Sequence, residues 1–180
     1  MPNLNILIVE GNDPKNNEFF KKAAKASCSE NLKNLVLKLE PNSEIKIINP
    51  ARDDQTKTAL ENIKNYDGII FTGGAMRLND MTDEIKKHIN FASDCFKFDN
   101  KILAICWGLQ VCSVAAGGKV ASGINGAHIG IASDIEINDE GNSVRVSSPI
   151  RSYRDNRYGF FALKTRSHGY IIDGTRSWDN

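Results

Sequence analysis

Short apolar runs constrain the fold of this chain more than any other feature of its sequence. Residues 5–10 (NILIVE), 44–49 (EIKIIN), 68–74 (GIIFTGG) and 101–106 (KILAIC) have the length of strands, and most of them run into a turn rich in glycine, asparagine or proline. Strands that are largely apolar, without strict alternation, are typical of parallel sheets covered by helices on both faces. These runs therefore predict a mostly parallel sheet.

Segments with helical periodicity separate the apolar runs. Apolar residues recur at helical spacing within 19–27 and 32–39, and 58–65 is also helical in pattern. Thr82 can cap a further helix with an acidic first turn. Its expected buried face consists of Ile85, Ile89, Ala92 and Phe96. The alternation of strands and helices predicts an α/β, three-layer, doubly wound (flavodoxin-like) fold.

The C-terminal part has a different pattern. Residues 128–137, 143–148 and 160–168 are short alternating stretches joined by polar turns. They predict a small antiparallel addition to the sheet. Repeats and convincing linkers are absent from the sequence, so we expect one domain over residues 1–180.

Composition excludes several classes of function. The 23 basic and 22 acidic residues give a net charge of +1, which does not favour nucleic acid or an anionic membrane as a partner. The sequence shows no signal peptide and no run of eighteen apolar residues, so we expect a cytoplasmic protein without a membrane span. The four cysteines lack metal-binding spacing, and Gly73-Gly74 lacks the other residues of a nucleotide-binding loop. We therefore expect free thiols, no metal and no cofactor.

Cys106 lies where a predicted strand gives way to a helix, flanked by the small residues Ala104 and Gly108. A sharp strand-to-helix turn exposes its central side chain at the end of a sheet. The helix N-terminus there favours a thiolate, which lowers the pKa of the cysteine and makes it a nucleophile. Backbone N–H groups of Trp107 and Gly74 could stabilise an oxyanion. The pattern alone fits a small buried residue at a strand end equally well.

Four segments resemble the class I glutamine amidotransferases, in the expected order. The segment 101–120 resembles the part that carries the nucleophile, and 68–74 resembles the oxyanion strand. The segment HIGIASDIEI (128–137) resembles the part after the elbow, and TRSHGY (165–170) resembles the substrate-binding Ser-His-Gly turn. The amidotransferase domain of GMP synthase and its stand-alone relatives are the nearest in character.

The resemblance implies a glutaminase in which Cys106 attacks the side-chain amide of L-glutamine, forms a glutamyl thioester and releases ammonia to a synthetase domain or subunit. By the same resemblance, Gly74 and Trp107 supply oxyanion N–H groups. The residues implied to bind substrate are Gln110, Ser167 and His168. Formation of a homodimer stays open.

The sequence also departs from the family pattern. Ala104 replaces a usual glycine, His128 stands where an acidic residue is common, and Tyr170 replaces a frequent substrate-binding aspartate. The family's catalytic His and Glu belong to a later His-x-Glu motif that residues 1–180 do not contain. Loss of a general base lowers rates by at least about 10²-fold. We therefore expect the chain to be C-terminally incomplete and its own activity to be low or absent.

The three histidines offer weak replacements for that base. His168 is the tempting candidate, but by the resemblance it belongs to the substrate-binding turn. His88 falls on the helix after Thr82, where we expect a partly exposed structural histidine, and for His128 we favour a structural role in a strand. Cys95 and Cys112 have apolar neighbours and fit core thiols.

Three functions remain open at this point. The first is a glutamine-hydrolysing class I amidotransferase, which we favour. The second is an inactive binding or regulatory module with the same fold. The third is another cysteine hydrolase on this scaffold, with His168 or His128 as its base.

Overall fold

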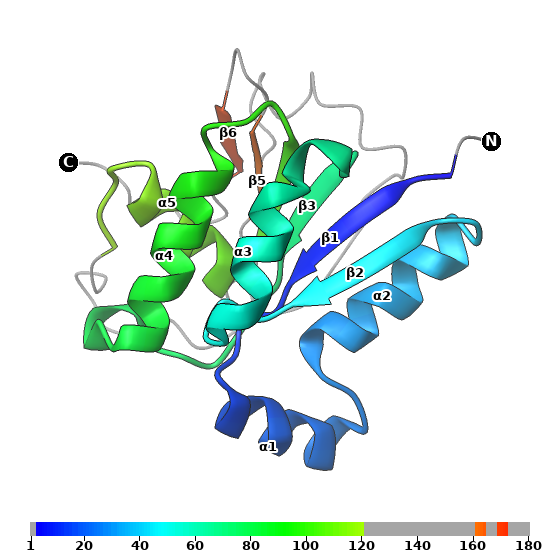
Figure 1. Ribbon diagram of the computed structural model, residues 1–180. Helices are drawn as coiled ribbons and strands as arrows, with labels where there is room; N and C mark the ends of the chain where they lie inside the picture. Colours follow the sequence, from blue (N-terminus) through cyan, green and yellow to red (C-terminus); the bar gives the residue numbers. More distant parts are fainter. Residues whose placement is uncertain (1–2, 121–160, 165–168, 173–180) are drawn as a thin grey trace, which may run out of the picture.

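A six-stranded sheet organises the chain (Figure 1). The computed structural model describes residues 3–120, 161–164 and 169–172. The strand order is β2-β1-β3-β4-β5-β6. The first four strands in the chain run parallel and the last two antiparallel. Their bounds are β1 (Asn5–Val9), β2 (Glu44–Ile48), β3 (Gly68–Phe71), β4 (Lys101–Ile105), β5 (Phe161–Lys164) and β6 (Gly169–Ile172).

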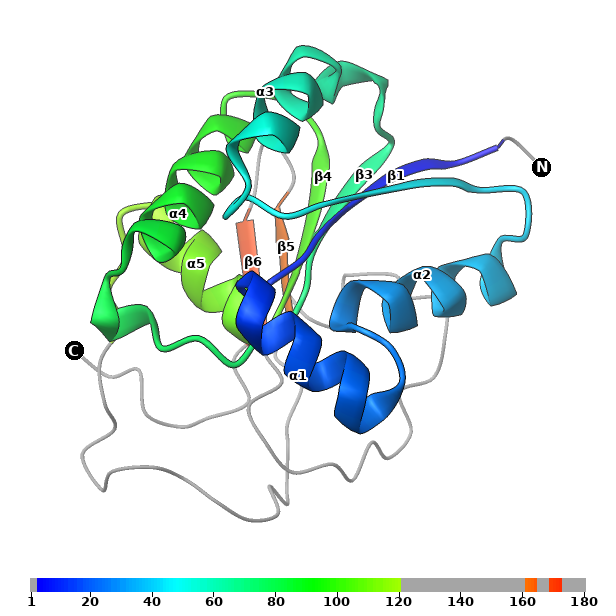
Figure 2. The ribbon, with the colours of Figure 1, turned by 60° about the horizontal axis from the view of Figure 1, so that its bottom comes forward.

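Helices cover both faces of the sheet. Figure 2 shows α2 on one side of the sheet and α3 and α4 on the other. The bounds are α1 (Pro14–Ala24), α2 (Cys28–Leu39), α3 (Asp53–Glu61), η1 (Ile63–Asn65), η2 (Leu78–Asp80), α4 (Asp83–Cys95) and α5 (Trp107–Ala115). This arrangement confirms the predicted doubly wound α/β fold.

Local sequence signals explain where the helices begin and end. The first helix ends at Ala24, earlier than predicted, because Lys25 adopts a left-handed conformation (φ 62°). Ser27 then caps α2: its side chain accepts the N–H of Glu30, whose carboxylate accepts the N–H of Ser27. The predicted helix over 58–65 instead begins at Asp53 and finishes as the short 3-10 turn η1.

The core lies between the sheet and the helices on the α3–α4 side. Leu7, Val9 and Ile69 from the sheet are at most 1% exposed. The cap of α4 follows prediction, since the Thr82 hydroxyl accepts the N–H of Ile85. His88 on α4 corrects our expectation, because it is fully buried. The reason is that His88 lies on the buried face of α4, where its Nε2 is 3.0 Å from the carbonyl oxygen of Glu10.

Two of the predicted antiparallel stretches, 128–137 and 143–148, lie outside the described residues. The third overlaps β5, which pairs antiparallel with β4, and β6 continues the sheet beyond it. Within the described ranges, no helix combines the length and the apolar character that crossing a membrane requires.

Candidate functional site

The four parallel strands end at one edge of the sheet, and the residues that follow them form the candidate site. The segments that meet there follow Val9, Ile48, Phe71 and Ile105. Ligands bind at this carboxyl edge in open α/β sheets. The candidate nucleophile therefore lies on the edge where this fold binds its ligands.

Cys106 has the backbone of a sharp elbow. It lies between β4 and α5 with φ 52° and ψ −113°, a conformation that L-residues rarely adopt. Its carbonyl already accepts the N–H groups of Leu109 and Gln110, so the helix starts immediately after it. Ala104, which replaces a usual glycine of the family, lies in regular strand β4 without a positive φ.

Close packing against β3 fixes the elbow. The N–H of Gly108 donates to the carbonyl of Thr72 at 3.1 Å. A Cβ on Gly108 would lie 2.7 Å from the carbonyl oxygen of Phe71, closer than real Cβ contacts. Position 108 therefore requires glycine, because the first turn of α5 touches the backbone of β3.

The turn after β3 lies beside the nucleophile. A Cβ built on Gly73 would stand 3.5 Å from the Cβ of Cys106. Gly74 packs on the segment that follows β1, where its own Cβ would come within 2.4 Å of the carbonyl oxygen of Gly11. Among the described residues, no acceptor takes the N–H of Gly74. Gly73 of this turn thus lies beside Cys106, and the oxyanion role of the Gly74 N–H stays a prediction.

Thr72 joins the segments that build this edge. Its N–H donates to the carbonyl of Val9 at 3.0 Å. Its hydroxyl accepts the N–H of Gly11 at 2.8 Å and donates to the carbonyl of Gly73 at 3.0 Å. Since its own carbonyl accepts the N–H of Gly108, one buried residue connects β1, the glycine turn and the elbow.

The electrostatics of Cys106 differ from our expectation. Burial raises the pKa of its thiol, and the hydrogen bond from the backbone N–H of Trp107 opposes that rise only in part. The helix N-terminus was expected to lower this pKa. Desolvation outweighs it, because the described residues place no imidazolium or other cation against the sulfur.

His88 does not serve as a base for this thiol. Its Nδ1 lies 2.8 Å from the carbonyl oxygen of Glu84, and its Nε2 lies 3.0 Å from that of Glu10. Burial lowers its pKa, although both carbonyls and the Glu10 carboxylate oppose the effect. Its ring packs nearly perpendicular to that of Trp107 with centroids 5.0 Å apart, so His88 supports the residue after the nucleophile.

Trp107 packs its ring under the elbow. The side chain is 2% exposed, and its Nε1 has no hydrogen-bond acceptor among the described residues. The backbone N–H, by contrast, points at the Cys106 thiol. The side chain therefore fills space under the elbow, and the oxyanion role of the Trp107 N–H stays a prediction.

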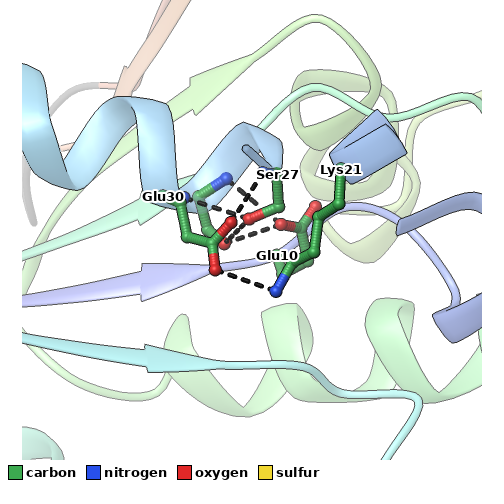
Figure 3. A network of polar contacts seen from close by, with 5 residues as sticks. Glu10, Lys21, Ser27 and Glu30 are labelled. Atoms are coloured by element: carbon green, nitrogen blue, oxygen red, sulfur yellow. Dashed lines mark hydrogen bonds and ion pairs between the residues drawn. The ribbon is translucent and has the colours of Figure 1, made fainter. Parts of the chain in front are cut away.

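A buried carboxylate occupies the end of β1. Glu10 is 1% exposed and accepts four hydrogen bonds, two from Asn12 and two from Ser29. Figure 3 shows Glu10 beside the capping box of α2, where Ser27 contacts Ser29 and Glu30 pairs with Lys21 at 2.8 Å. The start of α2 is thus anchored to the candidate site.

Asn12 connects this carboxylate with the glycine turn. Its Nδ2 donates to Glu10 at 3.1 Å and reaches the sulfur of Cys28 at 3.7 Å, while its Oδ1 accepts the N–H of Ala75 at 2.8 Å. Burial raises the pKa of Cys28, and Cys106 interacts with it electrostatically. Cys28 is therefore a half-buried thiol that contacts Asn12.

Our sequence interpretation missed Glu10, Asn12, Cys28 and Thr72 as parts of the site. A signal was present, because polar residues follow the first and third apolar runs directly. The S-x-x-E pattern of residues 27–30 also marked the helix start that brings Cys28 to this edge. Polar residues after parallel strands meet at one edge, so both signals pointed here.

The implied substrate-binding residues have different outcomes. Gln110 lies on the first turn of α5, half-buried, with its N–H on the carbonyl of Cys106. Ser167 and His168 lie outside the described residues, as does His128. Their roles stay predictions.

A groove of about 560 Å³ lies beyond the glycine turn. Its lining includes Asn16, Ala75, Arg77 and Glu84, but not Cys106. Within the described ranges, no three His, Cys, Asp or Glu side chains are grouped to hold a metal ion.

Comparison with known proteins places this geometry in a family. Residues 23–179 match the family Glutamine amidotransferase class-I. A gamma-glutamyl-L-1-hydroxyisopropylamide hydrolase from Pseudomonas sp. is 30% identical over 120 residues, which cover 67% of this chain and 40% of the relative. The chain thus aligns with about two fifths of that hydrolase.

A solved structure also matches. A GMP synthase subunit protein from Thermoplasma acidophilum is 16% identical, with a TM-score of 0.48, over 98% of this chain and 70% of that chain. The family match extends over most of the sequence, and the hydrolase aligns with two thirds of it. This chain belongs to the class I glutamine amidotransferase family.

Proposed function

We propose that the protein hydrolyses the side-chain amide of glutamine through a thioester on Cys106 and delivers the ammonia to an acceptor. The observation that carries the proposal is the elbow itself. Cys106 has φ 52° at the start of α5, with the N–H of Trp107 on its sulfur and the Gly73-Gly74 turn beside it. A strained nucleophile next to backbone donors is the arrangement that acyl transfer uses.

In the proposed reaction, the sulfur of Cys106 adds to the γ-carbonyl carbon of glutamine. Negative charge develops on the carbonyl oxygen, where the N–H groups of Gly74 and Trp107 would donate. The carbon–nitrogen bond then breaks, and the nitrogen leaves as ammonia with the proton that the thiol has given up. Water cleaves the resulting γ-glutamyl thioester to glutamate and restores the thiol.

The transfer of the thiol proton is the demanding step. Burial raises the pKa of Cys106, and His88 is held by two backbone carbonyls. None of the other described residues is a histidine. We therefore expect acylation to be slow at neutral pH and to accelerate as the pH rises toward the elevated thiol pKa.

The substrate and partner follow the same proposal. Gln110, Ser167 and His168 would hold the amino-acid end of glutamine, and a synthetase domain or subunit would take up the ammonia. Family membership supports these assignments. The absence of disulfides among the four cysteines fits the reducing cytoplasm that we propose as the location.

Covalent labelling tests the proposal. The chain is incubated with an electrophilic glutamine analogue, and intact mass and peptide mapping locate the adduct. We expect one adduct on Cys106, suppressed by excess glutamine and absent in Cys106→Ser. If the glutamine analogue does not label Cys106 although iodoacetamide modifies it, the glutamine site does not exist. A binding or regulatory module is then the better description.

A second candidate is hydrolysis of an N-substituted γ-glutamyl amide. The hydrolase relative favours it, because the substrate in the name of that enzyme carries a hydroxyisopropyl group on the amide nitrogen. Both reactions share the γ-glutamyl thioester, so they differ only in the leaving amine. Protection of Cys106 by glutamine and by N-isopropyl-γ-glutamylamide, measured against the same label, separates them. Stronger protection by the substituted amide would favour the second candidate.

A further inference from the structure

The glycine turn that would supply an oxyanion donor is held by one side chain. Ala75 donates its N–H to Oδ1 of Asn12 at 2.8 Å. That bond orients the peptide after Gly74, and the carbonyl of Gly11 packs against Gly74 itself. The direction of the Gly74 N–H therefore depends on where Asn12 lies.

Asn12 is itself fixed by its surroundings. It is fully buried, and both its backbone N–H and its Nδ2 donate to Oε1 of Glu10, at 3.2 and 3.1 Å. Its carbonyl accepts Nδ2 of Asn49 at 2.8 Å. The other oxygen of Glu10 is held by Ser29 at the start of α2. The side-chain amide thus has one orientation, with the oxygen on the turn and the nitrogen on the carboxylate.

We propose that Asn12, anchored by Glu10, is a positioning residue that sets the Gly74 N–H for the oxyanion of the acyl-transfer step. The inference rests on the proposed function for its chemical consequence. Its structural content, that Asn12 holds the turn, can be tested separately. A shift of about 1 Å in such a donor costs on the order of 10²-fold in rate.

Two reagents separate this role from general stability. The p-nitrophenyl ester of the glutamate γ-carboxyl acylates Cys106 through an oxyanion, and its phenolate leaves without needing a proton. Iodoacetamide alkylates the same sulfur by direct displacement and forms no oxyanion. A change confined to the ester reaction therefore reports on the oxyanion donors, whereas a change in both reports on the thiol.

Asn100 provides a matched control. Asn100 is partly buried, whereas Asn12 is fully buried, but the Asn100 side chain likewise joins two backbone segments, with Nδ2 on the carbonyls of Ile63 and Tyr66. It precedes β4 at the opposite edge of the sheet. We expect Asn12→Ala to slow acylation by the ester about 10- to 100-fold and to leave iodoacetamide alkylation within about twofold. Asn100→Ala should leave both rates within about twofold.

Exchange of the two partners gives a rescue test. Asn12→Asp alone places two carboxylates together and should lose ester acylation as Asn12→Ala does. Adding Glu10→Gln lets the new amide at position 10 donate to the new carboxylate at position 12, which still accepts the N–H of Ala75. The double variant should recover part of the rate, because the backbone N–H of residue 12 still loses the acceptor that Oε1 of Glu10 provides. Failure to recover, with the fold intact, would contradict the proposed pairing.

Hydrogen exchange tests the structural part without any substrate. The amide of Ala75 should lose protection in Asn12→Ala and keep it in Asn100→Ala. If protection persists, or if the ester and iodoacetamide rates fall together, Asn12 does not position the turn. If wild-type Cys106 reacts with iodoacetamide but not with the ester, while Ala75 depends on Asn12, then the proposed function fails and the positioning role stands.

Discussion

The two ends of the parallel sheet hold similar polar groups in opposite surroundings. At the amino end, the carboxylate of Asp67 accepts the N–H of Asn5 at 2.8 Å in exposed surroundings. At the carboxyl end, the carboxylate of Glu10 accepts four hydrogen bonds while 1% exposed. Water can replace the partners of Asp67, but it cannot reach those of Glu10.

This difference in exposure shows that each hydrogen bond matters more for stability at the carboxyl end of the sheet than at the amino end. A broken hydrogen bond at an exposed end costs little, because water takes the vacant position. A broken bond around Glu10 or Thr72 leaves a buried polar atom without a partner, at a cost of about 1–3 kcal/mol. The carboxyl end is thus held in one arrangement, as a site for chemistry requires.

The largest expected difference between the two ends concerns glycine. Gly108→Ala would push its Cβ into the carbonyl oxygens of Phe71 and Thr72, at 2.7 and 2.8 Å, and should destabilise the protein by about 3 kcal/mol. At the amino end, Gly68→Ala would meet only ordinary contacts at 3.5 and 3.7 Å. Urea unfolding of both variants measures this, and equal stabilities would show that the elbow is less crowded than described.

A second expected difference concerns the two carboxylates. Glu10→Gln turns an amide N–H₂ toward donors of Asn12 or Ser29, and should lower the free energy of unfolding by about 2 kcal/mol. Asp67→Asn, which is exposed, should change it by less than about 0.5 kcal/mol. Chemical denaturation at neutral pH compares the two. A mild Glu10→Gln would mean that water enters the network.

Thr72→Val tests the link between β1 and the glycine turn. The N–H of Gly11 would lose its acceptor and the carbonyl of Gly73 a donor, at an expected cost of about 1–2 kcal/mol. Thr58→Val on the exposed side of α3 is the size-matched control and should be near neutral. Hydrogen exchange at Gly11 should rise only in Thr72→Val, and an unchanged rate would argue against the link.

The smallest expected effect is a pH dependence from His88. Burial lowers its folded pKa below the ordinary 6.5, so the unfolded chain takes up the proton first. This contribution to stability is complete above pH 6.5 and is lost as the pH falls toward the folded pKa. The slope should be at most about 1.4 kcal/mol per pH unit. Urea midpoints at about pH 7.5 and 5.5 should differ less in His88→Gln than in the wild type.

Much of the fold was predictable because its signals are local. Apolar runs located the four parallel strands, and Thr82 marked the start of α4. Cys106 was found as well, since small neighbours on either side permit a tight turn. The fold class was therefore readable from periodicity and turn residues alone.

The rest of the site was not predictable, because it depends on segments that only the fold brings together. Glu10 and Ser29 are nineteen positions apart, and Asn12 and Ala75 are sixty-three apart. The direction of the Cys106 pKa was also misjudged, because a motif shows the helix N-terminus but not the burial of the thiol. His88 was misplaced for the same reason.

The positive φ of Cys106 means that the residue best for stability at this position differs from the residue needed for thiol chemistry. A backbone φ of 52° costs residues other than glycine about 1–3 kcal/mol, whereas glycine adopts it without strain. Cys106→Gly should therefore make a more stable protein that has lost its nucleophile. Selection for stability alone would replace this cysteine. In lineages that descend from this chain, a cysteine retained here would mark continued selection for thiol chemistry, and a glycine would mark its release.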